Sequence, residues 1–316
     1  MSEAVIITDK VSKNYDKFQA VIDLSLSIYS GEVFGLLGPN GSGKTTTILM
    51  LLGLTEPSAG NVSVLGFDPM RHSLEVKRRV GYLPDAVGFY DEMTARDNLV
   101  YTTRLAFGTK VNKEAEIMEV LGRMNLREVA GHKVRTFSRG MRQKLGLAEI
   151  LIKKPSIVIL DEPTNGLDPE SAVDFLGLVL SLKQEGITVL LSSHLLHQVQ
   201  SVCDRVGFFH KGRKVLEGTV PELAAHITKG RYKLYLEAAD CDPEKEMAGI
   251  REISSVEKRG DNILAVESET DLRAEIGRRI ISAGGRLLLL RQEEPDLDEV
   301  YARYFKGARD ENLENG

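Results

Sequence analysis

The eight residues from Gly38 to Thr45, GPNGSGKT, constrain this chain more than any other stretch of it. They have the spacing G-x-x-x-x-G-K-[ST] of a phosphate-binding loop, whose glycines let backbone N–H groups turn inward around a polyphosphate. Lys44 supplies a positive charge for the terminal phosphates, and the Thr45 hydroxyl is suited to bind Mg²⁺. A glycine-rich turn without a ligand is the alternative, but a chance match in 316 residues is expected only about once in a hundred chains.

The flanking sequence fits the strand, loop and helix that such a motif requires. Residues 33–37, VFGLL, form a short apolar run typical of a buried parallel strand, and residues 46–52, TTILMLL, predict an apolar helix that ends near Gly53. A dinucleotide-binding loop would need G-x-G-x-x-G instead. The lysine and threonine therefore favour a nucleoside triphosphate.

A second nucleotide-binding element is expected where residues 156–162 read SIVILDE. An apolar strand that ends in acidic residues is where phosphate-loop proteins place a carboxylate for Mg²⁺. We expect Asp161 to hold Mg²⁺ directly or through water, and Glu162 to polarise the water that attacks the γ-phosphate. The alternative is an acid that merely caps the next helix.

The composition limits the class of protein. The net charge of -5 argues against a protein that coats nucleic acid, so no nucleic-acid partner is expected. The two cysteines, Cys203 and Cys241, lie far apart without metal-ligand spacing, which suits a reducing compartment. The N-terminal sequence lacks the pattern of a signal peptide, and no run of about 18 apolar residues is present. If the chain serves a membrane process, the spanning part is expected to be another polypeptide.

The order of predicted elements indicates two folded parts. Up to about residue 220, short strands alternate with helical patterns, and residues 75–151 are mostly helical, which predicts an α/β core with a helical insertion at about 85–155. The second part reads β-α-β-β-α-β, the ferredoxin-like order of a small α+β domain. The expected strands are 4–9, 24–28, 33–37, 61–64, 80–83, 157–160, 188–191 and 205–209 in the first part, and 232–237, 253–258, 262–267 and 286–290 in the second. The expected helices of the second part are 243–249, 272–283 and a closing helix over 297–305.

Further motifs follow the phosphate loop in a fixed order. Residues 136–143, TFSRGMRQ, contain S-x-G-x-x-Q, and the motifs IVILDEP, GLD and SSH follow at 157–163, 166–168 and 192–194. This order resembles the nucleotide-binding subunits of ABC transporters over residues 1 to about 225. Each later motif is weak alone, whereas all of them in this order are highly specific. The resemblance implies an ABC-type P-loop ATPase domain over 1–226 that uses ATP and Mg²⁺, followed by an accessory domain over 231–305 and a polar tail over 306–316.

The resemblance also implies that one chain holds only half of each ATP site. Ser138 and Gly140 open a predicted helix, so a hydroxyl, backbone N–H groups and the positive helix end converge where an anion could lie. In the family, that anion is the γ-phosphate bound to the other subunit. A plain helix cap would use the same serine. His194 would contact the γ-phosphate and stabilise charge in the transition state, whereas a histidine without such a motif is usually structural.

Two more residues gain roles from the resemblance. Asp168 resembles the residue of the loop that touches the partner subunit, although by itself it reads as a turn residue. Tyr15 resembles the aromatic residue on which adenine stacks, the alternative being an ordinary surface tyrosine. The predicted nucleotide-binding set is Tyr15, Gly38, Pro39, Asn40, Gly41, Ser42, Gly43, Lys44, Thr45, Thr46, Asp85, Ser138, Arg139, Gly140 and Asp168, the catalytic set is Lys44, Glu162 and His194, and the metal-binding set is Thr45, Asp85 and Asp161.

The sequence departs from the family at two places. The usual L-S-G-G-Q is FSRGM at 137–141, where Arg139 would add a cation near the nucleotide, and this variation resembles a branch of ABC exporters with separately encoded membrane subunits. After GYLP, where most members carry glutamine, this chain has Asp85. A carboxylate can bind Mg²⁺ but cannot donate a hydrogen bond when ionised, so we expect hydrolysis to be slow or differently coupled to the membrane partner.

These observations predict an ATP-hydrolysing subunit that forms a homodimer, or a dimer with a close paralogue, around two Mg-ATP molecules. It would power the multi-spanning permease of an exporter. The subunit itself would be cytoplasmic and would bind peripherally at the inner face of the cell membrane through the permease. Residues 87–94, VGFYDEMT, would receive a short helix of the permease, or else form a local hydrophobic cluster. The alternative is a soluble ABC-type ATPase with a regulatory or non-transport role. Such proteins usually carry tandem ATPase halves or long coiled-coil insertions, which this sequence lacks.

Overall fold

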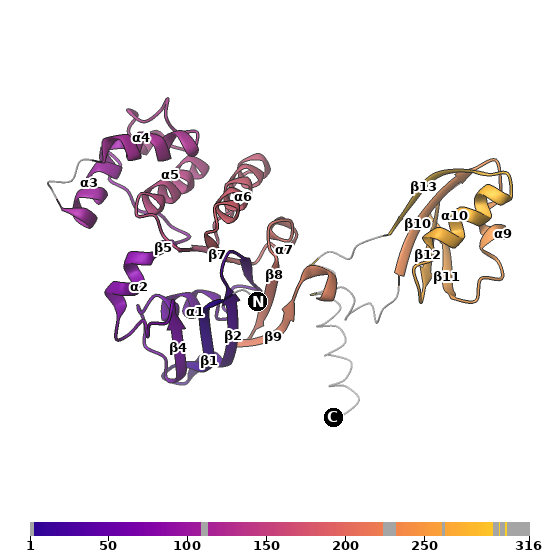
Figure 1. Cartoon of the computed structure of the whole chain (residues 1–316), viewed down its shortest axis with the longest axis horizontal. Coiled ribbons are helices and arrows are strands. Elements are labelled where there is room, and N and C mark those ends of the chain that lie inside the picture. The colour runs from indigo at the N-terminus through magenta and orange to yellow at the C-terminus, as the bar shows by residue number, and fades with distance from the viewer. Residues whose placement is uncertain are drawn as a thin grey trace. The chain divides into compact units, whose positions relative to one another are not determined.

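The computed structural model describes residues 3–108, 113–223, 232–260 and 263–292, together with Leu297 and Tyr301. The chain divides into two compact units, Met1–Gly218 and Thr219–Gly316, both drawn in Figure 1. The expected linker at 226–231, the polar tail over 306–316 and most of the helix expected over 297–305 lie outside the described residues.

A six-stranded mixed sheet forms the centre of the first unit. Its order is β5-β6-β7-β3-β8-β9. The first five strands in this order pair in parallel with their neighbours, and β9 pairs with β8 in antiparallel fashion. Strands β3, β6 and β7 are buried at every residue, as expected of parallel strands that are covered on both faces. The sequence does not predict β9, because half of its residues are charged. The bounds are β3 (Val33–Leu37), β5 (Val80–Leu83), β6 (Ile157–Asp161), β7 (Thr188–Ser193), β8 (Arg205–His210) and β9 (Arg213–Gly218).

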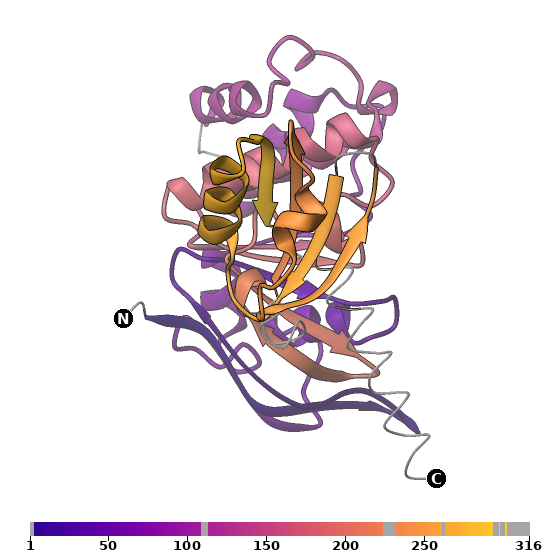
Figure 2. The ribbon, with the colours of Figure 1, turned by 90° about the vertical axis from the view of Figure 1, so that its right-hand side faces the viewer.

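A second sheet of the first unit consists of β2 (Phe18–Tyr29), β1 (Ala4–Tyr15) and β4 (Ala59–Val64), in the order β2-β1-β4. Its strands are antiparallel, and Figure 2 shows the long ribbon of β1 and β2 along its length. The sequence predicts β1 and β2 too short, because residues 10–15 and 18–23 are mostly exposed or half-buried and contain only short apolar stretches. The buried side chains of this sheet join one hydrophobic core with the helix that follows the phosphate loop.

The helices of the first unit form two groups. Those of the helical insertion include α3, α4 and α5, which contact one another, and the others lie beside the sheets (Figure 1). Helix α3 begins where the Thr94 hydroxyl accepts a hydrogen bond from the Asp97 N–H and caps the helix. None of the helices in the described parts of the chain is both long and apolar enough to cross a membrane. The helices are α1 (Lys44–Leu51), α2 (Ser73–Arg79), α3 (Ala95–Phe107), α4 (Glu114–Arg123), η1 (Val134–Thr136), α5 (Arg139–Leu151), α6 (Pro169–Gln184) and α7 (Leu196–Val199).

The second unit contains a four-stranded antiparallel sheet in the order β11-β12-β10-β13. Its two helices share one hydrophobic core with alternate residues of β10 and β12, so both helices cover the same face of the sheet (Figure 1). The elements follow one another as the sequence predicts, strand, helix, two strands, helix and strand. Their bounds are β10 (Tyr232–Ala239), α9 (Pro243–Met247), β11 (Ile253–Lys258), β12 (Ile263–Ser268), α10 (Arg273–Ser282) and β13 (Arg286–Gln292).

Candidate nucleotide-binding site

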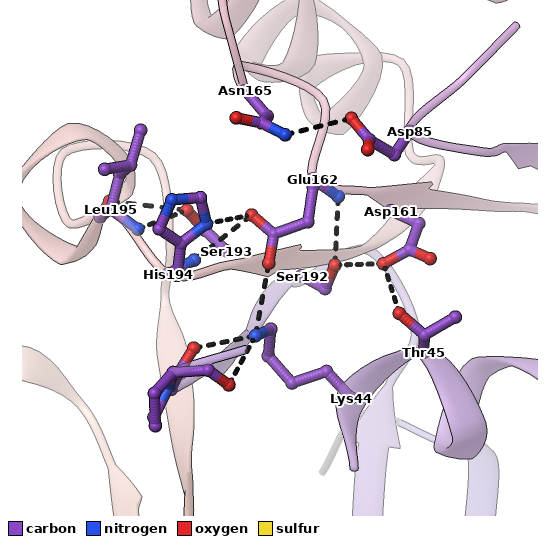
Figure 3. Close-up of polar contacts among 12 residues, drawn as sticks. Lys44, Thr45, Asp85, Asp161, Glu162, Asn165, Ser192, Ser193, His194 and Leu195 are labelled. Atoms are coloured by element: carbon purple, nitrogen blue, oxygen red, sulfur yellow. Dashed lines mark hydrogen bonds and ion pairs between the residues drawn. The ribbon is translucent and has the colours of Figure 1, made fainter. Parts of the chain in front are cut away.

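The polar motifs of the sequence meet at one edge of the six-stranded sheet. Strands β6, β7 and β3 are neighbours and parallel, so their carboxyl ends lie side by side. The phosphate loop follows β3, the pair Asp161 and Glu162 ends β6, and residues 192–194 end β7. Figure 3 shows the side chains of these three segments turned toward one another. Open α/β sheets bind their ligands at this edge.

The phosphate loop has a backbone that only glycine allows at two positions. Gly43 has a φ of 106°, and a Cβ atom there would lie 2.5 Å from the carbonyl oxygen of Ala20. A Cβ atom on Gly38 would lie 2.2 Å from the carbonyl oxygen of Phe209. The loop therefore packs directly against the backbone of two strands and leads into the N-terminus of α1.

The residues of this loop fit a polyphosphate. Among the described residues, the buried Ser42 hydroxyl finds no hydrogen-bond partner within the chain. The same is true of few other buried side chains, and such a group normally has a partner. The loop also provides the N-terminus of α1 and the buried ammonium of Lys44, both of which attract anions. Pro39, Asn40, Gly41 and Thr45 are exposed at this edge, where they are accessible to a nucleotide.

Replacement of Gly43 by alanine should weaken ATP binding by about 5- to 150-fold, because strained backbone of this kind costs about 1–3 kcal/mol. The close Ala20 oxygen forces either the loop or β2 to move. Titration with a fluorescent ATP analogue measures the effect, and Gly131→Ala, which meets no atom within 4 Å, is the matched control. Equal affinities of the two variants would contradict this account of the loop.

Lys44, Glu162 and His194 form one charged group. The Lys44 ammonium donates hydrogen bonds to the carbonyl oxygens of Gly38 (2.7 Å) and Pro39 (3.2 Å) and lies 3.1 Å from Glu162 Oε1. His194 Nδ1 lies 2.7 Å from Glu162 Oε2, and the backbone N–H of His194 donates to the same oxygen. Glu162 has a φ of 49°, a left-handed conformation that is uncommon for a residue with a side chain and recurs at functional sites.

Asp161 belongs to a second group of oxygen atoms beside the first. Its Oδ1 accepts hydrogen bonds from the hydroxyls of Ser192 (2.5 Å) and Thr45 (3.3 Å), as Figure 3 shows. Carboxylate and hydroxyl oxygens are ligands that Mg²⁺ prefers, so this pair fits the metal. Burial, helped by the nearby carboxylates of Asp161 and Asp85, raises the pKa of Tyr82 to about 12. Its phenol therefore stays neutral beside these acids.

Asp85 lies in a third group, which the sequence did not predict. Its Oδ1 accepts hydrogen bonds from Arg139 Nη2 (2.7 Å) and Asn165 Nδ2 (3.2 Å). Its carbonyl oxygen accepts one from Gln143 Nε2 at 3.1 Å. Gln143 is the last residue of the S-x-G-x-x-Q motif and Asn165 directly precedes GLD, so their places in the motifs were the available signal. The helical insertion and the loop after β6 thus both contact the loop after β5.

Ser138 and Asp168 are helix caps within the single chain. Ser138 Oγ accepts a hydrogen bond from the Met141 N–H, and Asp168 accepts hydrogen bonds from the N–H and hydroxyl of Ser171. These bonds from Ser171 lower the pKa of Asp168. The contacts agree with the helix-cap and turn interpretations, and the expected roles of both residues toward a partner subunit stay predictions.

Tyr15 ends β1 with a side chain that is available for stacking. The residue is 45% exposed, and the Lys13 ammonium lies 4.9 Å from the centre of its ring. An exposed ring of this kind suits either a surface tyrosine or a platform for a base.

Comparison with known proteins agrees with this geometry. The family model described as "ABC transporter" matches residues 21–165. A bacitracin transport ATP-binding protein of Bacillus licheniformis is 34% identical over 307 residues, which cover 96% of this chain and 98% of that protein. A linearmycin resistance ATP-binding protein of Bacillus subtilis is 31% identical over 304 residues, which cover 93% of this chain and 96% of the relative.

The fold also matches solved structures. One of them, an ATP-binding subunit of an ABC transporter, superposes with a TM-score of 0.62 at 28% sequence identity. The match covers 71% of this chain and 93% of the solved chain. This match shows that the chain has the α/β phosphate-loop fold of such ATP-binding subunits.

Proposed function

We propose that this chain, which belongs to the ATP-binding proteins of ABC transporters, acts as one half of a dimer that closes around two Mg-ATP molecules and drives an export permease. The chain binds ATP and hydrolyses it for transport. The observation that carries the finer proposal is the convergence of Lys44, Glu162 and His194 beside the unpartnered Ser42 hydroxyl.

The charged group suggests how ATP binding prepares hydrolysis. Without nucleotide, the Lys44 ammonium neutralises Glu162, whose side chain is only 12% exposed. The terminal phosphates of ATP carry more negative charge than one carboxylate, so they should draw Lys44 away. Glu162 is then free to accept a proton from the attacking water, and His194 keeps its carboxylate in place from the other side.

Thr45 and Asp161 are the residues that we propose to hold Mg²⁺, with Asp85 as a further candidate. Mg²⁺ would supply positive charge that offsets the charge developing on the phosphate oxygens. The Ser192 hydroxyl fixes the orientation of the Asp161 carboxylate by donating to it at 2.5 Å. Asp161 is only 4% exposed, so its oxygens are already oriented before a metal binds.

We propose a homodimer, or a dimer with a close paralogue, because the start of α5 offers unused anion-binding capacity. Ser138 and Gly140 stand at the N-terminus of a helix of 13 residues, and no acidic residue lies in its first turn. A phosphate held by the partner's loop would complete both sites. Asp168, at the start of α6, is proposed to contact the partner across the same interface, and Tyr15 to stack on adenine.

The permease is proposed to dock on the helical insertion at the inner face of the membrane. Tyr90 is 54% exposed and meets the 39% exposed Tyr101 edge to face, with ring centres 5.1 Å apart. Leu105, on the same helix as Tyr101, is 70% exposed. Exposed apolar side chains on one element favour a protein contact. Export rather than import is supported by the relatives, which are named for bacitracin transport and linearmycin resistance.

We further propose that the ATPase domain spans 1–226, with a helical subdomain at about 85–155, and that residues 231–305 form a ferredoxin-like accessory domain. The order of elements in the second unit supports this, as does the antiparallel sheet in which the first and third strands, β10 and β12, are central. No nucleic-acid partner is proposed.

Isolation of the complex tests the permease proposal. The Glu162→Gln chain, tagged in its own host and extracted gently from membranes with ATP present, should bring down a multi-spanning protein in stoichiometric amount, identified by mass spectrometry. The double variant Tyr90→Glu/Leu105→Glu should lose that protein, because charge on the exposed apolar surface opposes docking, while it still binds ATP. Recovery only from the soluble fraction, with ribosomes, nucleic acid or nothing attached, would overturn the proposal.

A further inference from the structure

Arg139 contacts two loops of the first unit at once. It is the first residue of α5, and its guanidinium donates to Asp85, which follows β5, at 2.7 Å. The same carboxylate oxygen accepts from Asn165, which follows β6. Gly166 has a φ of 68°, and a Cβ atom there would lie 3.2 Å from the central carbon of the guanidinium. One side chain therefore packs on the loop before α6 and also pairs with the loop after β5.

The loop that carries Asp85 is fixed to α5 by more than this ion pair. Gln143, one turn into α5, donates to the carbonyl oxygen of Asp85. Further along α5, a Cβ atom on Gly146 would lie 2.5 Å from Leu83 Cδ1, so β5 and α5 are in close contact. A movement of α5 must therefore carry the Asp85 loop along. The carboxylate, however, is held only by Arg139 and Asn165 among the described residues.

The ion pair between Asp85 and Arg139 is exposed enough for either side chain to change its partner. The side chains of Asp85 and Arg139 are 45% and 47% exposed, and ion pairs in such surroundings contribute little to stability. Two positions at which this sequence departs from the family thus carry opposite charges and contact each other.

We propose that Arg139 is a positioning residue for Asp85, because it holds the Asp85 carboxylate against α5 and Asn165. In this position the carboxylate binds Mg²⁺ less readily. This inference rests on the proposed Mg-ATP site. Because a guanidinium binds phosphate as well as carboxylate, an ATP held by the partner subunit competes for Arg139. Release of Asp85 toward the metal in one subunit would then depend on nucleotide in the other.

The test is a Mg²⁺ titration of the full-length chain with a fluorescent ATP analogue, at a protein concentration where sedimentation shows only monomer. Arg139→Gln should lower the Mg²⁺ concentration at half-saturation by about two- to fivefold, the range that an exposed ion pair supports. The same change in an Asp85→Asn background should have no effect. Arg139→Lys, which keeps the charge, should restore much of the original midpoint.

The controls separate this inference from the proposed site. Asp161→Asn should raise the Mg²⁺ requirement whatever residue stands at position 139, and failure to do so would contradict the Mg-ATP site itself. If Asp161→Asn behaves as expected, an unchanged or higher midpoint in Arg139→Gln overturns the role of Arg139. An equal shift with and without the Asp85→Asn change overturns it too, because Arg139 would then act without the Asp85 carboxylate.

Discussion

Glu162→Gln should reduce ATP hydrolysis by about 10²- to 10⁴-fold, the range that loss of a general base produces, while ATP-bound dimers accumulate. The amide keeps the size of the side chain and can still bond to His194, which lies 2.7 Å from the carboxylate. It cannot accept the proton of the attacking water. ATP binding should persist, because the phosphate loop and Lys44 are unchanged.

Two measurements check this result. Phosphate release gives the rate of hydrolysis, and analytical ultracentrifugation with Mg-ATP gives the fraction of dimer. Glu128→Gln is the matched control, since Glu128 is an exposed glutamate of the helical insertion. A Glu162→Gln variant that hydrolyses ATP at the unaltered rate would remove Glu162 as the base, and one that stays monomeric at saturating ATP would contradict the dimer.

The sequence predicts the central strands of the first unit well, because burial on both faces leaves a simple signal. Val33–Leu37 is predicted to the residue, and the strand of the acidic motif differs by its last residue. Strand β9 has three charged residues, and only its pairing with β8 makes it a strand. Patterns along the chain cannot reveal this kind of stabilisation, since it comes from a neighbour in space.

The site shows the same division. The motifs identify Lys44, Glu162 and His194 one by one, but their contact depends on β7 lying between β3 and β6, an order that differs from the order in sequence. The contact of Arg139 with Asp85 joins residues 54 positions apart. Each is visible in the sequence as a departure from the family pattern, whereas the ion pair between them required the structure.

Lys44→Met should cost about 2–4 kcal/mol of ATP binding, or roughly 30- to 1000-fold in affinity, because it removes a buried charge that meets the phosphates. The same change should destabilise the nucleotide-free protein. Glu162, whose side chain is 12% exposed, then keeps a buried carboxylate without the ammonium that lies 3.1 Å away. The cost should stay below the roughly 3–5 kcal/mol of a broken buried ion pair, because His194 still bonds to the carboxylate.

The charge exchange proposed for ATP binding predicts that this second cost is not additive. In urea unfolding without nucleotide, Lys44→Met/Glu162→Gln should be more stable than Lys44→Met alone, because the double variant no longer holds a carboxylate that has lost its ammonium partner. Lys77→Met, at an exposed lysine of α2, is the control for loss of a positive charge. If the two single changes add, the Lys44–Glu162 contact carries no energy before ATP binds. Release of Glu162 by the phosphates could not then prepare the base, and hydrolysis would have to depend on the closing of the dimer alone.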